Sequence, residues 1–502
     1  MAILIDQRRR SSYKKGIDSE SIRERRENVS KQIRKLSKEH KLQQRRRMNH
    51  TIPPPLLQTT ATYNHQKSTT SMRRDVQRLA AKILSFDTNE QLNGVSDLRE
   101  LLFSHPDSLI GIVLDLDLVP LLMEFLQAYN NPPIQIQSAW ALTRIVSNSS
   151  QKNICSNLIP ILCELTLGRN DDVCEQAIWS LGYLARASTT LRDYILDAGV
   201  MMPMLIVVKQ SRENEYILRT AMWTISNFFR HRTIPDLQLV GPVMEILRLV
   251  IDATDQEVLI DACCTLLAFS TCSEIVESII ENGICERVID LLSHCCEKIQ
   301  SAAIQIVGNV LAESEHVTKT MLELDICLRF PTLMKHPNDS IRRDVCWAIS
   351  NVTAVSKIEI QTVIDAHLIP ILLHISTEDE FSVKREAIWA LSNAICHGTR
   401  DQVAILIEHG CEPIFFKMLE TVDVDVLNLC LDTLKCILSH KNVLLDEMDS
   451  QNTIQSLQYH PNKSALHLFL ISTHILNSVD IAIKATEIID NYADEDTTMA
   501  DS

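Results

Sequence analysis

Aromatic residues and glycines are both scarce in this chain. Of its 502 residues, Phe, Trp and Tyr together make up 5%, and only 11 residues are glycine. Few aromatic residues argue against a β-rich fold, and few glycines argue against the glycine-rich loops that hold phosphate groups. The motifs Gly-x-Gly-x-x-Gly, P-loop, His-Glu-x-x-His and Gly-x-Ser-x-Gly are absent, and the 16 histidines lie apart. We therefore expect neither an enzyme nor a bound cofactor.

The chain also lacks cysteines at the spacing typical of metal ligands, although cysteine itself is frequent. The chain has 15 cysteines, scattered and without any Cys-x-x-Cys pair. This distribution favours buried, reduced thiols in helices over metal ligands or disulfides. Reduced thiols are typical of a cytosolic or nuclear protein.

Long hydrophobic runs are missing as well. The apolar core of Met1–Arg10 is too short for a signal peptide. The longest apolar tract, Leu109–Leu126, is interrupted by Asp115 and Asp117, so we expect no membrane span.

What the chain does contain is an internal repeat. The phrase R-E-A-I-W-A-L-S-N at Arg385–Asn393 returns in similar form at Val345–Asn351 and Ala221–Asn227, and more loosely at Ser138–Arg144 and Ala177–Tyr183. The aligned Trp positions are Trp140, Trp179, Trp223, Cys264, Gln305, Trp347, Trp389 and Asp432. Successive positions are 39 to 44 residues apart. A period of about 42 predicts an all-α fold, a right-handed superhelical armadillo-repeat solenoid of about ten three-helix repeats.

Prolines give the same register independently. They occur in phrases such as L-I-P-I-L, at Pro120, Pro160, Pro203, Pro242, Pro370 and Pro413. Because proline suits the first turn of a helix, we expect a helix to start at each phrase and the last helix of the repeat about 10 to 15 residues later. The Trp and the residue four positions on then share one helix face. Stacked repeats should form a ladder of indoles and amides along a groove.

Charge is distributed unevenly along the chain. Residues 1–50 hold 16 Lys and Arg against 6 Asp and Glu, so they carry +10 and the remainder of the −15 chain carries −25. Ser21 and Glu24 fit a capping box at the start of a basic helix whose apolar face is too small to bury itself. We expect four segments: a basic arm (1–47), a flexible linker (48–72), a repeat domain (73–480) and an acidic tail (481–502).

The arm and the repeats together resemble a known family. The segment Arg23–Lys38, followed by Arg45-Arg46-Arg47, resembles the importin-β-binding segment of importin-α (karyopherin-α) proteins, and the repeated W-x-x-x-N is similar to the armadillo body of that family. The resemblance runs from about Arg8 to Leu476 and includes a short last repeat. It implies a nuclear import adaptor that shuttles between cytoplasm and nucleus. Its groove would hold the basic nuclear localisation signal of a cargo protein, its arm would dock on importin-β, and a recycling exportin would contact the C-terminal repeats, here about Val403–Leu476.

The resemblance also assigns residues to roles. The arm residues that would contact importin-β or act as a self-inhibiting mimic of cargo are Arg23, Arg25, Arg26, Arg34, Lys35, Lys38, Arg45, Arg46 and Arg47. The major cargo site would comprise Trp140, Trp179, Asp193, Trp223, Asn227 and Asp261. The minor cargo site would comprise Asn309, Glu315, Asp344, Trp347, Asn351, Glu386, Trp389 and Asn393. We expect gaps between the indoles to accept Lys and Arg stems, the Asn amides to bond the peptide backbone, and the carboxylates to receive the charged heads.

The major site departs from the family pattern. The ladder Asn is replaced by Arg144 and Tyr183 in two repeats, and one Trp is replaced by Cys264. Arg144 removes a backbone partner and adds a cation, so we expect this site to be weaker than the minor one. The sequence leaves open whether Arg144 points into the groove or outward into solvent, and whether Tyr183 donates its hydroxyl to a peptide.

Three other functions are compatible with parts of the pattern. A specialised importin-α-like paralogue with a weakened major site is one. An armadillo scaffold of the adhesion or signalling kind is another, but its groove is usually basic, whereas this body carries −25. Nucleic-acid binding through the arm is disfavoured by the interleaved Glu20, Glu24, Glu27 and Glu39 and by the absence of a basic body.

Overall fold

The computed structural model describes residues 69–104, 106–147, 152–211, 214–230, 237–418 and 423–441. All of them belong to one compact unit, residues 68–502. Every regular element within these ranges is helical. The predicted arm (1–47), the last short repeat near 452–476 and the acidic tail (481–502) lie outside the described residues.

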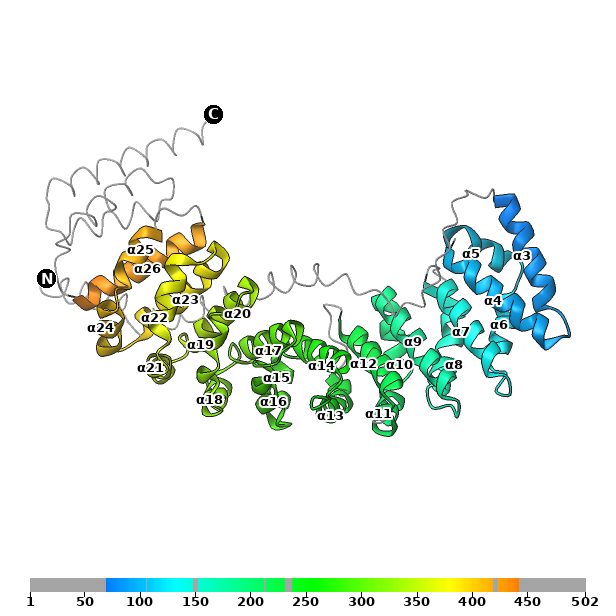
Figure 1. The fold of residues 1–502 in the computed structure, drawn as a ribbon, viewed down its shortest axis with the longest axis horizontal. Coiled ribbons are helices and arrows are strands. Elements are labelled where there is room, and N and C mark those ends of the chain that lie inside the picture. The colour runs from blue at the N-terminus through cyan, green and yellow to red at the C-terminus, as the bar shows by residue number, and fades with distance from the viewer. Residues whose placement is uncertain are drawn as a thin grey trace, which may run out of the picture. The chain divides into compact units, whose positions relative to one another are not determined.

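The helices that carry the aligned Trp positions follow one another in a row (Figure 1). Each packs against the next, and α4 precedes the first of them in the same way. We refer to these helices as the third helices. They are α4 (Thr88–Ser104), α7 (Pro132–Ser147), α9 (Asp171–Ala187), α12 (Glu215–Phe229), α14 (Gln256–Phe269), α17 (Glu297–Val310), α20 (Asp339–Val352), α23 (Phe381–His397) and α26 (Val424–Lys441).

Shorter helices flank the third helices and pack on them. In successive repeats α6, α8, α11, α13, α16, α19, α22 and α25 each contact the third helix that follows. The bounds of the shorter elements are α3 (Thr69–Ile83), α5 (Pro106–Asp115), α6 (Val119–Leu126), α8 (Lys152–Leu165), α10 (Thr189–Asp197), α11 (Met201–Gln210), η1 (Leu237–Leu239), α13 (Val240–Val250), α15 (Ser273–Glu281), α16 (Ile284–Leu291), α18 (Glu315–Glu323), η2 (Ile326–Leu328), α19 (Phe330–Leu333), α21 (Lys357–Asp365), α22 (Leu368–Glu378), α24 (Arg400–Glu408) and α25 (Glu412–Lys417).

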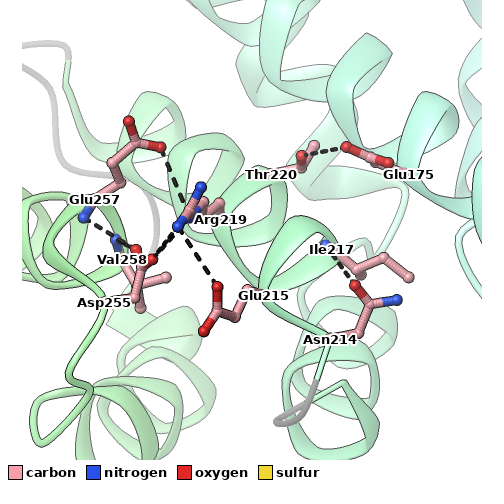
Figure 2. A network of polar contacts seen from close by, with 9 residues as sticks. All are labelled: Glu175, Asn214, Glu215, Ile217, Arg219, Thr220, Asp255, Glu257 and Val258. Carbon is pink, nitrogen blue, oxygen red and sulfur yellow. Dashed lines mark hydrogen bonds and ion pairs between the residues drawn. The ribbon is translucent and has the colours of Figure 1, made fainter. Parts of the chain in front are cut away.

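Helix α12 shows how a polar start and a wide apolar face produce a third helix. In α12 the side chain of Asn214 accepts a hydrogen bond from the N–H of Ile217 at 3.5 Å (Figure 2), which satisfies one of the free donors of the first turn. Leu218, Met222 and Ile225 are then buried on one face. Such positions form one continuous apolar core through the stacked repeats. Each repeat therefore depends on its neighbours for burial, and a fully buried aliphatic side chain contributes about 1.5 to 3 kcal/mol.

The proline marker predicts five of the six helix starts. Pro120 and Pro413 are the second residues of α6 and α25, and Pro203, Pro242 and Pro370 are the third residues of α11, α13 and α22. The expectation is wrong at Pro160, which lies inside α8. Cys155 and Leu158 are buried before it, so packing keeps the preceding turns helical although the proline cannot donate a hydrogen bond there.

The boundary between linker and repeat domain also differs from the prediction. Helix α3 begins at Thr69, inside the segment 48–72 that was expected to be flexible. Met72 and Val76 are buried one turn apart, and α3 packs on α4 and α5. The helical stack therefore starts before residue 73.

Polar side chains at the beginning of the third helices connect each repeat to the next. Arg219 of α12 donates through Nε to Oδ2 of Asp255, the residue that caps α14, at 2.8 Å (Figure 2). The same type of link recurs between Arg342 and Asp379 and between Arg385 and Asp423. We call these contacts the inter-repeat links.

The 15 cysteines are free thiols, and nine of them are buried. Burial raises the pKa of Cys263 and of Cys430 to about 12. The predicted buried thiols are therefore present, with Cys295 as an exposed exception.

No group of three or more His, Cys, Asp or Glu side chains in the described part of the chain could hold a metal ion. No single helix in the same described ranges is long and apolar enough to cross a membrane. The consecutive helices α21 and α22 are together long and apolar enough, but they are bent by 83° relative to each other.

Candidate functional site

The third helices bring the first three predicted indoles together. Trp140 of α7 stacks on Trp179 of α9 with ring centroids 4.2 Å apart and an interplanar angle of 28°. Trp179 is nearly parallel to Trp223 of α12, with centroids 6.3 Å apart and an angle of 12°. These three side chains therefore line up on one face, as the period predicts.

The predicted gaps between these rings are not open. An aliphatic stem between two flat rings requires about 7 to 8 Å, because each carbon contact takes about 3.5 to 4.0 Å. Both centroid separations, 4.2 Å and 6.3 Å, are shorter than this. The expectation that Lys or Arg stems fit between Trp140, Trp179 and Trp223 is therefore wrong for the structure as it stands.

An arginine of the chain itself lies against the first indole. The guanidinium carbon of Arg99, on α4, is 6.0 Å from the centroid of the Trp140 ring, within the range of a cation–π attraction. The sequence interpretation missed this contact. The repeat period could have found it, because Arg99 lies 41 residues before Trp140 and so takes the Trp position of the preceding repeat.

Arg144 and Tyr183 stand where the N-terminal half would have ladder asparagines, and their side chains form a hydrogen bond with each other. Nη1 of Arg144 donates to the Tyr183 hydroxyl at 2.5 Å, and the Tyr183 ring stacks on Trp179 at 5.1 Å. Arg144 is half-buried, so its alternative as a solvated outward side chain is wrong. Tyr183 accepts a hydrogen bond from Arg144, whereas the sequence suggested a donor toward a peptide.

The two C-terminal indoles have different surroundings. Trp347 of α20 is buried and Trp389 of α23 is half-buried, and in the described part of the chain neither stacks on another aromatic ring. The Trp347 ring lies against Gly308 of α17, where an added Cβ would overlap it. Gly182 has the same relation to Trp223, since a Cβ there would be 2.8 Å from Cζ3 of the ring.

Three of the four ladder asparagines connect repeats, whereas Asn227 bonds within its own helix. The Nδ2 groups of Asn351 and Asn393 donate to the carbonyl oxygens of Gly308 and Ser350 at 2.8 and 2.9 Å. Asn309 donates to Ser270 Oγ at 2.9 Å, and Asn227 donates to Trp223 O at 2.8 Å. All four side chains are at most 4% exposed, so in this structure their Nδ2 groups are already paired within the chain.

Two of these amides keep an unused acceptor. Oδ1 of Asn227 and Oδ1 of Asn351 are buried and accept no hydrogen bond in this structure. A buried acceptor without a donor is unfavourable by about 1 to 3 kcal/mol. A backbone N–H brought against either oxygen would remove that cost.

Three predicted carboxylates lie one turn before a Trp position. Asp344 of α20 and Glu386 of α23 are 1% and 4% exposed. Asp261 of α14 accepts a hydrogen bond from Ser226 Oγ at 3.0 Å. Burial raises the pKa of Asp261 to about 6, and the Ser226 hydrogen bond and the charge of Arg230 limit the rise.

Asp193 and Glu315 are separated from this group. Asp193 lies on α10, where its Oδ1 accepts bonds from Nη2 and Nε of the buried Arg192 at 2.6 and 2.8 Å. Glu315 is the exposed first residue of α18. Neither lies on a third helix, whereas all the other described site residues do.

Comparison with known proteins also covers N-terminal residues that the structure does not describe. Residues 9–96 match the importin beta binding domain, and residues 314–354 and 358–395 match the armadillo/beta-catenin-like repeat. The chain is 34% identical over 301 residues to importin subunit alpha-2 of Arabidopsis thaliana, which covers 57% of this chain and 54% of that protein. It is 32% identical over 317 residues to importin subunit alpha-3 of the same plant, covering 62% and 59%.

The chain is thus similar to importin-α proteins. Its alignments span little more than half the length of these two relatives. The predicted arm residues fall within the 9–96 match, but they lie outside the described residues.

The fold also has a solved counterpart. The crystal structure of an engineered protein superposes with a TM-score of 0.65 at 19% identity, covering 80% of this chain and 99% of that one. The predicted all-helical armadillo-repeat solenoid is confirmed. The number of about ten repeats stays a prediction.

Proposed function

We propose that this chain is a nuclear import adaptor and not an enzyme. It binds basic nuclear localisation signals of cargo proteins along the third helices and links them to importin-β through the arm, residues 1–47. It shuttles between cytoplasm and nucleus, and a recycling exportin takes it back through the C-terminal repeats. The match of residues 9–96 to the importin beta binding domain supports the proposed binding of importin-β.

The arrangement around Trp347 and Trp389 is the observation that carries this proposal. Both indoles lack a stacked ring among the described residues. The buried carboxylates Asp344 and Glu386 lie one turn before them, and the unused Oδ1 of Asn351 lies one turn after Trp347. These groups match an extended cationic peptide, which would compete at Asp344 with Arg343, whose Nε donates to Oδ1 of Asp344 at 3.4 Å.

Each contact would contribute a modest amount. A Lys or Arg over an indole is worth about 0.5 to 2 kcal/mol, and a hydrogen bond to Asn351 about 0.5 to 1.5 kcal/mol. Micromolar affinity requires about −8 kcal/mol. Several repeats must therefore contribute at once.

A second candidate is a specialised importin-α-like paralogue that has lost ordinary cargo binding in its N-terminal half. The Arg144–Tyr183 hydrogen bond favours it. An armadillo scaffold that binds acidic peptides is less compatible with the buried Asp344 and Glu386.

The proposal is tested by titrating the full-length chain with a labelled peptide that carries one basic cluster. We expect Trp389→Ala to weaken binding about 2- to 30-fold, the range of one cation–π contact, and Trp223→Ala to weaken it less. Fluorescence anisotropy measures both, and thermal unfolding of each variant controls for folding. The reverse ranking would contradict the assignment to the C-terminal half.

A further inference from the structure

The N-terminal half of the indole row already holds cations supplied by the chain. Arg99 lies over Trp140, and Arg144 reaches from α7 to Tyr183 on α9. These are the types of contact that a basic peptide would make with an indole and a polar ladder side chain. A bound peptide would have to displace them.

Tyr183 also fixes the rings around it. It stacks on Trp179 at 5.1 Å and is bound by Arg144 from the preceding third helix. Trp179 is thus held against Trp140, where the 4.2 Å centroid separation leaves no space for an aliphatic stem.

The position one turn before each Trp changes chemically along the chain. In the N-terminal half it is occupied by Gln137, Gln176 and Thr220. In the later repeats it is occupied by Asp261, Ala302, Asp344 and Glu386. Thr220 donates a hydrogen bond to Glu175 of the preceding third helix at 3.0 Å (Figure 2).

We propose that Arg144 and Tyr183 are specificity-determining residues that close this half to cationic peptide. The adaptor then recognises signals with a single basic cluster, bound around Trp347 and Trp389, and a second cluster adds no affinity. This inference rests on the proposed function and narrows its substrate class.

The experiment compares two labelled peptides on the full-length chain. One carries a single basic cluster, and the other carries two clusters joined by a neutral linker of about 10 to 12 residues, a span of about 18 Å for a flexible chain. For the unaltered chain we expect the two dissociation constants to agree within about twofold. An advantage of tenfold or more for the two-cluster peptide would overturn the inference, because a linked second contact raises affinity only where a second site exists.

The decisive variant is Arg144→Asn with Tyr183→Asn. We expect the two-cluster peptide to bind it at least tenfold more tightly than the single-cluster peptide, while the single-cluster affinity stays unchanged. Tyr183→Phe keeps the ring on Trp179 but removes the acceptor for Arg144, and it should give a smaller gain. No gain in either variant, with both folded by circular dichroism, would overturn the inference.

A matched control removes the same residue types elsewhere. Arg169 and Tyr194 are exposed, and Arg169→Asn with Tyr194→Asn changes the net charge equally. We expect this variant to behave like the unaltered chain, and a gain equal to that of the first variant would overturn the inference by showing a general charge effect. If neither peptide binds any form of the chain, the proposed function itself fails; if the single-cluster peptide binds and only the gain is missing, this inference alone fails.

Discussion

The residue four positions after each Trp decides what a repeat offers to its neighbour. Asn351 and Asn393 donate to carbonyl oxygens of the preceding third helix, whereas Arg144 donates to Tyr183 of the following one. The sequence locates all these side chains on one face, because their period is regular. It does not predict their partners, since a hydrogen bond between residues 39 or 43 positions apart depends on how two helices pack.

Asp261 gives a prediction at this scale. Its pKa is about 6 in the folded chain because of burial, against 3.8 for an ordinary Asp. The folded state therefore holds a proton that the unfolded state releases between pH 4 and 6, and the stability contribution of Asp261 falls as pH rises through this window. We expect Asp261→Asn to stabilise the chain by about 1 to 2 kcal/mol more at pH 7 than at pH 4.

Urea titrations at the two pH values measure this difference. Glu315→Gln, at an exposed carboxylate, is the control and should show little change. A larger stabilisation by Asp261→Asn at pH 4 would contradict the sign.

At the scale of elements, glycine sets how closely two third helices approach. A Cβ at Gly308 would overlap the Trp347 ring, so we expect Gly308→Ala to destabilise the chain by about 1 to 3 kcal/mol and to weaken peptide binding near Trp347. Gly111, in α5, has nothing within 4 Å of an added Cβ. Gly111→Ala should therefore stabilise by about 0.5 to 1 kcal/mol through helix propensity. Chemical unfolding compares the two variants, and equal effects would refute the packing argument.

The inter-repeat link between Arg342 and Asp379 is the second prediction for elements. Arg342 makes two 2.7 Å hydrogen bonds to Asp379, and these bonds lower the pKa of Asp379 below 3.8 despite opposing burial. The link therefore stabilises the chain above pH 4, and its contribution is lost as pH falls through the lowered pKa. We expect Asp379→Asn to cost about 1.5 to 3 kcal/mol at pH 7, the worth of hydrogen bonds to a charged group, and progressively less in acid.

The control for this prediction is an exposed pair of the same kind. Asp252 lies 3.1 Å from Arg287, but the Asp252 side chain is 77% exposed. Asp252→Asn should cost less than about 1 kcal/mol. Urea midpoints at pH 7 and pH 3.5 measure both variants, and a cost for Asp379→Asn that did not shrink in acid would argue against the link.

Element boundaries show where local sequence is sufficient. Proline starts α6, α11, α13, α22 and α25 because its chemistry acts within one turn. Pro160 and the predicted domain start at residue 73 fail as boundaries because buried side chains nearby extend the helices beyond their local signals.

At the scale of the whole molecule, charge is segregated between the first 50 residues and the rest. The arm carries +10 and the remainder −25, and we propose that this opposite charge makes the arm a tethered competitor for the proposed cargo site. We expect the triple change Arg45→Ala, Arg46→Ala and Arg47→Ala to tighten binding of a single-cluster peptide by about tenfold or more, given a millimolar effective concentration for a tethered ligand. Changing Arg8, Arg9 and Arg10 to Ala removes the same charge and should have a smaller effect. Equal affinities for all three chains would argue against self-competition.

The fold was predictable because it depends on a pattern repeated many times. Trp347 and Trp389 lie in their predicted helices, and the wrong helix start at Pro160 does not alter the period. The closed state of the N-terminal rings was not predictable. It depends on Arg99 contacting Trp140 and on Arg144 contacting Tyr183, side chains that come from three helices. A repeat alignment shows which positions are equivalent, but it does not show which side chains are in contact.

The inter-repeat links have a consequence for how this protein can change length. Each link joins a cation on one repeat to an anion on the next, as between Arg219 and Asp255 or Arg342 and Asp379, so it has a direction. Removing the repeat between Arg342 and Asp423 would therefore again present an arginine to an aspartate, because both links have the same order of charges. An inserted repeat keeps the row of links unbroken only if it brings an aspartate to the repeat before it and an arginine to the repeat after it.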